Sequence, residues 1–402
     1  MINYSDAEEI IKIEFKKLEL KTEQIDLLNS TNRILAEDIY SDINLPPFDN
    51  SAMDGIAIKF NSNIKNWKII GEIPAGNYND FPLDEHSAVS IMTGSKLPQN
   101  CDTVIPIEDI EIKDDFAFLK ENSKFKKGIN IRKLGEDLLK DNIALNKNTL
   151  LKPHHIAVAA SCGRSTLKVY KRLKIGVLAT GNELVDIHEI PNDDKIRCSN
   201  LYSIISAIRN LNMHSVNFGI VKDNTQLIKD RLKWALDSEL DILITTGGVS
   251  FGKFDYVKEV FEEIGVETKF WRVKIKPGKP IFFGTYFNDN TKTLIFGLPG
   301  NPVSSLVNFL LFVQQNVLNL FNLPETLKFI AELENDLFKI DNKRHFMRGI
   351  FRYQNNGKFY VRSIGSQSSG NLAEMGKANC LIIVEEEKIN PRKGDLVECM
   401  II

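Results

Sequence analysis

The sequence predicts a multidomain α/β protein in which a doubly wound α/β domain is combined with a β-rich domain and a small C-terminal β domain. With 402 residues, the chain is too long for one hydrophobic core. Strand and helix patterns alternate from residue 173 onwards, which is typical of a doubly wound fold. Short β-like runs separated by turns fill residues 46–145 and return after residue 322.

The first part of the chain changes character at a pair of prolines. Helical spacing covers roughly the first forty residues and stops at Pro46 and Pro47, because two prolines cannot continue a helix. Residues 152–169 predict a short helix and a strand that lead back toward the core. The predicted domains are an elongated helical and linking domain of residues 1–45 with 146–171, a β-rich domain of residues 46–145, an α/β domain of residues 172–322 and a C-terminal domain of residues 323–402.

The α/β domain is predicted from four strands and four helices that follow one another. The strands are expected at residues 174–179, 215–221, 241–246 and 294–296. The helices are expected at residues 200–211, 225–240, 255–264 and 302–321. The last helix is apolar but carries several asparagines and glutamines, which favours a buried helix over a membrane span.

The composition excludes several classes of protein. Hydrophobic residues make up 43% of the chain and charged residues 26%, and the net charge of -2 gives no basic surplus for nucleic acid. Five scattered cysteines without a C-x-x-C motif argue against a disulfide scaffold and a zinc site, and fit a reducing cytoplasm. The N-terminus does not have the pattern of a signal peptide. We therefore expect a cytoplasmic protein that binds neither nucleic acid nor membrane.

A glycine turn follows the third predicted strand, in the stretch DILITTGGVSFGKFDY at residues 241–256. Gly247 and Gly248 allow a sharp turn and close approach to a ligand, and a helix is expected to start at Asp255. Strand, turn and helix start together predict an anion pocket. The spacing of Gly247 matches a P-loop, but Phe254 stands where that motif needs a hydroxyl. A purely structural turn is the alternative interpretation.

Three acids follow three predicted strand ends, namely Glu183, Asp223 and Asp255. In an open parallel sheet, ligands bind beyond these ends, so the carboxylates are expected to lie close together. Oxygen ligands of this kind suit Mg²⁺, which usually takes one or two carboxylates plus a substrate phosphate. For Asp223, helix capping together with Gln226 is an equally good interpretation.

Two further turns carry candidate anion-binding groups. In the stretch WRVKIKPGKP, Pro277 and Gly278 force a turn between Lys276 and Lys279, so both ammonium groups could meet one anion. Solvated surface lysines are the alternative. In GLPGNPVSS, Asn301 is predicted to cap a helix whose start forms a second anion pocket.

Six motifs occur in one order along nearly the whole chain: PPFDNSAMDG, IMTGSKLP, ATGNEL, TTGGVSFGKFDY, IKPGKP and GLPGNPVSS. Together they resemble the MoeA family of molybdopterin molybdenumtransferases, which is related to the E domain of gephyrin. The resemblance implies a homodimer whose subunits contain a MogA-like α/β domain and a C-terminal β-barrel. It also implies the last step of molybdenum cofactor synthesis. Adenylylated molybdopterin and molybdate would bind, Mg²⁺ would assist release of AMP, and a MogA-type adenylyltransferase would be a partner.

The resemblance also assigns roles to residues of this chain. The catalytic residues would be Asp54, Thr93, Glu183, Asp223 and Asp255, of which Glu183, Asp223 and Asp255 would hold the metal. The substrate-binding residues would be Gly247, Gly248, Ser250, Lys276, Lys279, Asn301, Arg348 and Ser369. Asn182 and Arg272 depart from the family pattern, which commonly has an acid and a lysine there.

Two other functions are compatible with these motifs. A molybdopterin adenylyltransferase would share the α/β domain, and a gephyrin-like scaffold would share the fold without the reaction. The β-rich domain, with its own acid at Asp54, favours the molybdenum insertion step.

Overall fold

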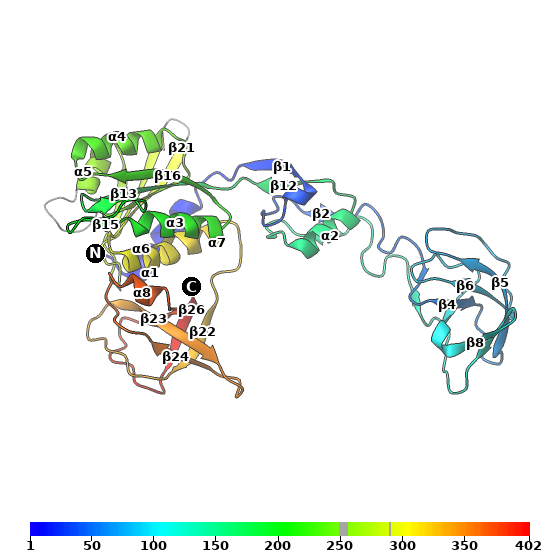
Figure 1. The fold of residues 1–402 in the computed structure, drawn as a ribbon. Helices are drawn as coiled ribbons and strands as arrows, with labels where there is room; N and C mark the ends of the chain where they lie inside the picture. Colours follow the sequence, from blue (N-terminus) through cyan, green and yellow to red (C-terminus); the bar gives the residue numbers. More distant parts are fainter. Residues whose placement is uncertain (249–255, 289–290) are drawn as a thin grey trace. The chain divides into compact units, whose positions relative to one another are not determined.

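The computed structural model describes residues 1–248, 256–288 and 291–402, which form two compact units. The α/β unit contains Met1–Glu23 and Tyr170–Ile402, and the β-rich unit contains Gln24–Val169 (Figure 1). Each unit is described by itself. The division into four domains stays a prediction.

A six-stranded sheet forms the centre of the α/β unit, in the strand order β16-β13-β17-β21-β20-β18. Four strands are parallel and match the predicted ones: β13 (Lys174–Thr180), β16 (His214–Val221), β17 (Ile242–Thr246) and β21 (Thr291–Leu298). Two antiparallel strands were not predicted, namely β20 (Phe282–Asn288) and β18 (Glu267–Trp271). All residues of β17 are buried, as expected for a strand that is covered on both faces.

Helices cover both faces of this sheet (Figure 1). One face carries α4 (Thr225–Leu236) and α5 (Tyr256–Glu263). The other face carries α3 (Ser199–Asn210) and a helical run of α6 (Pro302–Asn308), a π-helical turn (Phe309–Gln314) and α7 (Gln315–Leu320). Leu178 and Leu243 of the sheet pack with Ile228 of α4 and Phe261 of α5 in one buried cluster. Each such side chain contributes about 1.5–3 kcal/mol to stability by leaving water.

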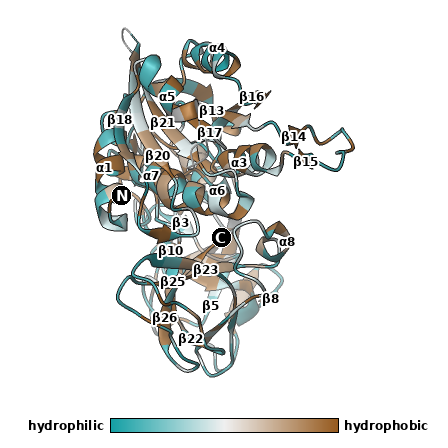
Figure 2. Cartoon of the chain, turned by 90° about the vertical axis from the view of Figure 1, so that its left-hand side faces the viewer, coloured by the Kyte–Doolittle hydropathy of each residue, from teal (hydrophilic) through white to brown (hydrophobic). Residues whose placement is uncertain are grey.

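The helical run Pro302–Leu320 is long and apolar enough to span a membrane by length and composition alone. However, 72% of its most apolar window is buried inside the unit, as in a core helix of a folded domain. A short parallel pair, β14 (Leu184–Val185) and β15 (Ile196–Arg197), projects from the same unit (Figure 2).

The N-terminal helix α1 (Tyr4–Phe15) belongs to the α/β unit. Its Glu14 is buried and binds Lys17 and Lys292, the latter near the start of β21. The prediction that roughly the first forty residues are helical is therefore wrong beyond Phe15. Residues 22–26 instead form β1 (Thr22–Asp26), because their side chains alternate between exposed and half-buried positions.

The tail of the chain forms a closed five-stranded barrel, as predicted from the resemblance. Around the barrel the strands run β23-β24-β22-β26-β25, and β25 pairs again with β23. Their bounds are β22 (Lys328–Leu333), β23 (Arg344–Tyr353), β24 (Phe359–Ser363), β25 (Cys380–Val384) and β26 (Leu396–Ile401). The short strand β19 (Ile275–Lys276) pairs with β23, and α8 (Leu372–Met375) precedes β25. The lysine turn therefore lies against the barrel.

The β-rich unit contains a second six-stranded sheet, in the order β7-β4-β6-β5-β9-β8. Its strands are β4 (Gly55–Ile58), β5 (Asn66–Ile73), β6 (Ser87–Ile91), β7 (Thr103–Pro106), β8 (Ile110–Lys113) and β9 (Phe116–Leu119). They match the predicted β-like runs. Trp67, Ile56 and Ile105 are fully buried in its core.

Shorter elements complete the β-rich unit. Three strand pairs are formed by β1 with β12 (Thr166–Tyr170), β2 (Ile39–Tyr40) with β11 (Ile143–Leu145), and β3 (Asn50–Ser51) with β10 (Ile131–Arg132). Helix α2 (Pro153–Ser161) and β12 confirm the predicted helix and strand in residues 152–169.

Candidate active site

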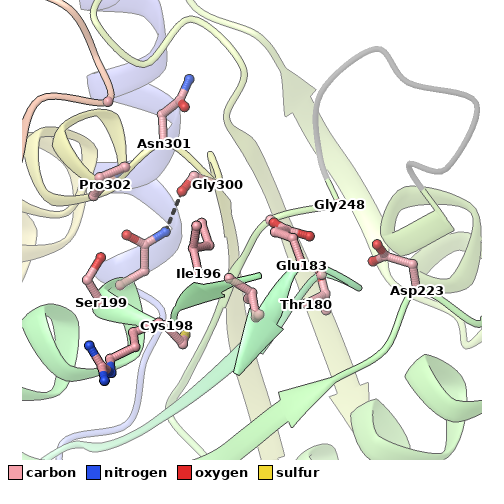
Figure 3. A pocket seen from close by; sticks show the side chains of 16 residues that line it. Thr180, Glu183, Ile196, Cys198, Ser199, Asp223, Gly248, Gly300, Asn301 and Pro302 are labelled. Atoms are coloured by element: carbon pink, nitrogen blue, oxygen red, sulfur yellow. Dashed lines mark hydrogen bonds between the residues drawn. The ribbon is translucent and has the colours of Figure 1, made fainter. Parts of the chain in front are cut away.

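A pocket of about 520 Å³ lies beyond the carboxyl ends of β13 and β17 (Figure 3). Five predicted site residues line it: Glu183, Asp223, Gly247, Gly248 and Asn301. The sheet order places β13 between β16 and β17, so the pocket lies where the connections of a doubly wound sheet diverge. The structure therefore brings Glu183 and Asp223 to one pocket with the glycine turn, as expected, and adds Asn301, which was predicted to belong to a separate pocket. The roles of these residues stay predictions.

Asp223 is fixed by its neighbour across the strand ends. Its Oδ2 accepts a hydrogen bond from Asn182 N at 3.0 Å, and Asn182 Oδ1 accepts one from Asp223 N at 3.1 Å. The helix α4 is capped instead by Asn224, whose side chain accepts a hydrogen bond from Leu227 N at 3.0 Å. The capping interpretation of Asp223 is therefore wrong. The amide of Asn182 positions the acid without adding a second negative charge beside it.

The glycine turn needs both of its glycines. Gly247 and Gly248 have φ values of 92° and 65°, in the left-handed region. A Cβ on Gly247 would lie 2.3 Å from Thr180 O, and one on Gly248 would lie 2.4 Å from Val257 Cγ2. The turn therefore brings its backbone close to β13 and α5. The predicted residues Ser250 and Asp255, and the P-loop-like Gly252-Lys253, lie outside the described residues.

A second pocket, of about 530 Å³, contains both predicted lysines, Lys276 and Lys279, together with Ser369. Asn301 lines this pocket as well as the first one. The turn between the lysines is held by Asn308, whose buried Nδ2 donates to Gly278 O at 3.0 Å. In the sequence, Asn308 is only one of several asparagines and glutamines in the apolar helix predicted at residues 302–321. A buried amide at such a position indicates a specific partner.

Asn301 occupies the predicted position before the first turn of α6, and Pro302 is the first helical residue. The side chain of Asn301 makes no capping hydrogen bond. It is the backbone carbonyl of Asn301 that accepts a hydrogen bond from Ser305 N, at 2.9 Å. That bond is the first hydrogen bond of the helix itself and satisfies none of the free N–H groups of the first turn. Within the described structure, the predicted side-chain cap is therefore absent, and Asn301 instead borders the two pockets.

Arg348 is only 1% exposed and supports the loop that carries Ser369. Its guanidinium donates to the carbonyl oxygens of Ser366 at 2.6 Å and Ser368 at 3.0 Å. Gln367 closes the arrangement by bonding to both backbone groups of Arg348. These contacts show Arg348 positioning the rim of the lysine pocket, and direct substrate binding by it stays a prediction.

Asp54 and Thr93 lie next to each other on the β-rich unit. They occupy the loop ends before β4 and after β6, two strands that pair in antiparallel register. Asp54 Oδ1 accepts hydrogen bonds from Thr93 N at 2.7 Å and Thr93 Oγ1 at 2.8 Å. These two bonds lower the pKa of Asp54, so its exposed carboxylate stays ionised. The family resemblance assigns catalytic roles to both residues, which stay predictions, and it does not predict their contact.

Fold and site together define a class: a doubly wound α/β protein with a carboxylate-lined pocket at its sheet switch point, extended by a β-barrel and a lysine pocket. Three family models match the chain in sequence. They describe the MoeA N-terminal region (domain I and II) at residues 2–163, a probable molybdopterin binding domain at 176–319 and the MoeA C-terminal region (domain IV) at 331–402. The chain belongs to the MoeA family.

Similar proteins extend over nearly the whole chain. A protein of Haemophilus influenzae named molybdopterin molybdenumtransferase is 35% identical, with 94% of this chain and 93% of that protein aligned. One of the same name from Staphylococcus aureus is 33% identical over 93% of this chain and 90% of that protein. The crystal structure of a molybdopterin biosynthesis protein from Pyrococcus horikoshii has a TM-score of 0.82 at 26% identity, with both chains fully covered. The predicted fold class, with a MogA-like domain and a small barrel, is confirmed.

Proposed function

We propose that this protein is a molybdopterin molybdenumtransferase that places molybdenum from molybdate on adenylylated molybdopterin and releases AMP in a Mg²⁺-dependent step. One observation carries the proposal. A pocket with two carboxylates and a glycine turn adjoins a pocket with two lysines, and Asn301 borders both. Such a pair of pockets suits one long anionic substrate and one oxyanion.

The lysine pocket supports molybdate binding by its charge. Molybdate and the pyrophosphate group of the substrate repel each other, so cations are needed where they meet. A pair of unit charges about 4 Å apart, at an effective dielectric constant near 20, is worth roughly 4 kcal/mol before desolvation. Lys276 and Lys279 can supply that charge because the turn held by Asn308 keeps both at one pocket.

The carboxylate pocket supports Mg²⁺ by its donor chemistry. Glu183 and Asp223 both line it, and Asp223 uses only Oδ2 in its hydrogen bond with Asn182 N. Within residues 1–248, 256–288 and 291–402, no group of three or more His, Cys, Asp or Glu side chains is arranged as a metal site. Two carboxylates together with a substrate phosphate are nevertheless what Mg²⁺ usually takes. When bound, the ion would neutralise phosphate charge as AMP leaves.

The remaining roles are proposals supported by the family. The glycine turn would hold the phosphates, with Ser250 and Asp255 of the same segment taking part. Asp54 and Thr93 would act in catalysis from the β-rich unit. Ser369 would contact the substrate on the loop that Arg348 positions. A homodimer, supply of the substrate by a MogA-type adenylyltransferase and a cytoplasmic location are likewise proposed.

The decisive experiment incubates the pure protein with adenylylated molybdopterin, molybdate and Mg²⁺. We expect AMP release together with formation of the molybdenum cofactor. Turnover of molybdopterin and ATP to adenylylated molybdopterin and pyrophosphate, without the first reaction, would instead identify an adenylyltransferase. Absence of both reactions in a folded, ligand-binding protein would favour a scaffold.

A further inference from the structure

The lysine pocket contains a third lysine, which none of the sequence motifs includes. Lys343 lines this pocket together with Lys276 and Lys279. The other polar residues of the pocket wall are uncharged, namely Asn301, Ser304, Gln367, Ser368 and Ser369. Among the residues that the structure describes, no aspartate or glutamate lines this pocket. Three cations without an acid form a site for an anion of high charge.

The pairing of two strands fixes Lys343 beside the lysine turn. Lys343 directly precedes β23 of the barrel, and β23 pairs in parallel register with β19, so that His345 lies opposite Lys276. Next to Lys343, Arg344 N donates a hydrogen bond to Lys274 O at 3.0 Å. The pocket therefore receives two lysines from the turn and one from the barrel, and backbone hydrogen bonds hold these two elements together.

Asp341 holds the side chain of Lys343 in place. Its Oδ1 accepts a hydrogen bond from Lys343 N at 3.1 Å, and its Oδ2 accepts one from Lys343 Nζ at 3.3 Å. His345 is only 2% exposed, and its Nε2 lies 2.8 Å from Asp341 Oδ1. Burial raises the pKa of Asp341, but the hydrogen bonds from His345 and Lys343 outweigh this and lower it. The carboxylate therefore stays ionised and keeps the ammonium group at the pocket.

This ion pair leaves Lys343 able to bind a ligand. An ammonium group has three N–H donors, and Asp341 accepts from Nζ at 3.3 Å with one oxygen only. The Lys343 side chain is 28% exposed, and ion pairs that are open to water are weak. Asp341 itself is not among the described residues that line the pocket. A doubly charged anion in the pocket can therefore bind the remaining donors of Lys343.

We propose that Lys343 is a third oxyanion-binding residue, and that it makes the lysine pocket select a doubly charged oxyanion over a singly charged one of the same shape. This inference rests on the proposed function, in which molybdate is the oxyanion. The attraction between Lys343 and an anion is proportional to the charge of the anion. Loss of this cation therefore costs a dianion about twice the binding free energy that it costs a monoanion.

The test measures binding of two oxyanions to the full chain by calorimetry. Molybdate carries two negative charges, and perrhenate is a tetrahedral oxyanion with one. In Lys343→Gln we expect molybdate to bind about tenfold more weakly than in wild type, as for the loss of a hydrogen bond to a charged group. Perrhenate should bind only about threefold more weakly, because half the change in binding free energy corresponds to the square root of that factor. Lys343→Arg keeps the charge and should keep the preference for molybdate.

The matched control is Lys358→Gln. Lys358 is also a barrel lysine beside an acid, with its Nζ 3.5 Å from Glu332 Oε2, but it is not among the described residues that line the pocket. Its replacement should leave the binding of both anions unchanged. If Lys343→Gln does not fold, Lys343→Met provides the same test, because its side chain also removes the charge and keeps most of the length.

Three results would overturn the inference and leave the proposed function standing. The first is unchanged molybdate binding in the folded Lys343 variant, and the second is an equal loss in Lys358→Gln. The third is the same loss factor for molybdate and perrhenate, because Lys343 would then shape the pocket without acting through its charge. Failure of wild type to bind either anion would overturn the lysine pocket as an oxyanion site, and both proposals with it.

Discussion

The carboxylate of Asp54 shows how two hydrogen bonds set the charge of one residue. Thr93 donates to Asp54 Oδ1 from its backbone and from its hydroxyl, and both bonds lower the pKa of the acid. Thr93→Val removes only the hydroxyl bond, so the pKa of Asp54 should rise. If catalysis needs the anion, the acid limb of the kcat/KM profile for AMP release should move to higher pH. Thr93→Ser should keep the wild-type limb, and an unmoved limb in Thr93→Val would speak against a catalytic anion.

Gly247 allows a sharper test, because the chain offers a matched glycine. Gly247→Ala would put a Cβ 2.3 Å from Thr180 O in addition to the strain of a φ of 92°. Gly265→Ala has a similar φ of 88° but meets nothing within 4 Å. We expect Gly265→Ala to cost about 1 kcal/mol of unfolding free energy, and Gly247→Ala roughly 1–3 kcal/mol more. Urea unfolding measures both, and equal costs would mean that the turn has room to relax.

At the scale of elements, the helical run Pro302–Leu320 supports the lysine turn through Asn308. Asn308→Leu should raise the molybdate concentration needed for half-maximal AMP release by about tenfold, because the turn at Gly278 loses its anchor. Asn316→Leu removes a buried amide that bonds within the same run and should lose comparable stability without that effect. The same half-saturating molybdate concentration in the two variants would show that the lysine turn keeps its conformation without the bond from Asn308.

The contact of α1 with the rest of the α/β unit should make the free energy of unfolding depend on pH in the acidic range. Burial raises the pKa of Glu14, but hydrogen bonds from Lys17 and Lys292 outweigh this and bring it to about 2, below the ordinary value of 4.5. A carboxyl with a lowered pKa stabilises the fold above pH 4.5, and that contribution is lost as the pH falls toward 2. Burial also lowers the pKa of Lys292, so the pair is worth less than Glu14 alone suggests.

Glu14→Gln should therefore cost roughly 1–3 kcal/mol of unfolding free energy at neutral pH. The difference from wild type should shrink steadily below pH 4.5. Denaturant unfolding at several pH values measures it. A difference that stays constant with pH would mean that packing, rather than charge, holds the helix.

The elements that could be predicted from sequence are those with a strong local pattern. The four parallel strands are continuous apolar runs, and their positions were found closely. The sequence does not predict β18 and β20, because the lysine turn between them is the dominant local pattern of residues 267–288. The contacts of Asn182, Asn200 and Asn308 could not be predicted, because their partners lie 41, 100 and 30 residues away along the chain. The spacing of residues within a short stretch of sequence does not predict a hydrogen-bond partner at such a distance along the chain.

For the whole molecule, the two compact units predict two separable unfolding transitions. Trp67 is fully buried in the β-rich unit, whereas Trp234 and Trp271 belong to the α/β unit. In a chain with Trp234→Phe and Trp271→Phe, the fluorescence of Trp67 reports on the β-rich unit. In a chain with Trp67→Phe, the two remaining tryptophans report on the α/β unit. When Glu14→Gln is added to each of these chains, only the unfolding transition of the α/β unit should shift. Transitions that move together would show one cooperative unit.

The whole-molecule organisation was also only partly predictable. The resemblance covers the family and its fold class, and both are confirmed. Helical spacing identified α1 but could not say which unit it joins, because an amphipathic face does not name its partner. Met1–Glu23 lies in the α/β unit through contacts such as that of Glu14 with Lys292, 278 residues away.

That separation has a consequence for synthesis on the ribosome. The α1 helix is made first, but Lys292 emerges only after the complete β-rich unit. At about 5–20 residues per second, the helix waits roughly 15 to 55 s for its partner. During this time the β-rich unit can finish folding, while the apolar side of α1 stays without its final cover. A nascent chain released before Lys292 is synthesised would contain a folded β-rich unit and an α1 helix whose apolar side is exposed. We expect chaperones to bind such a chain.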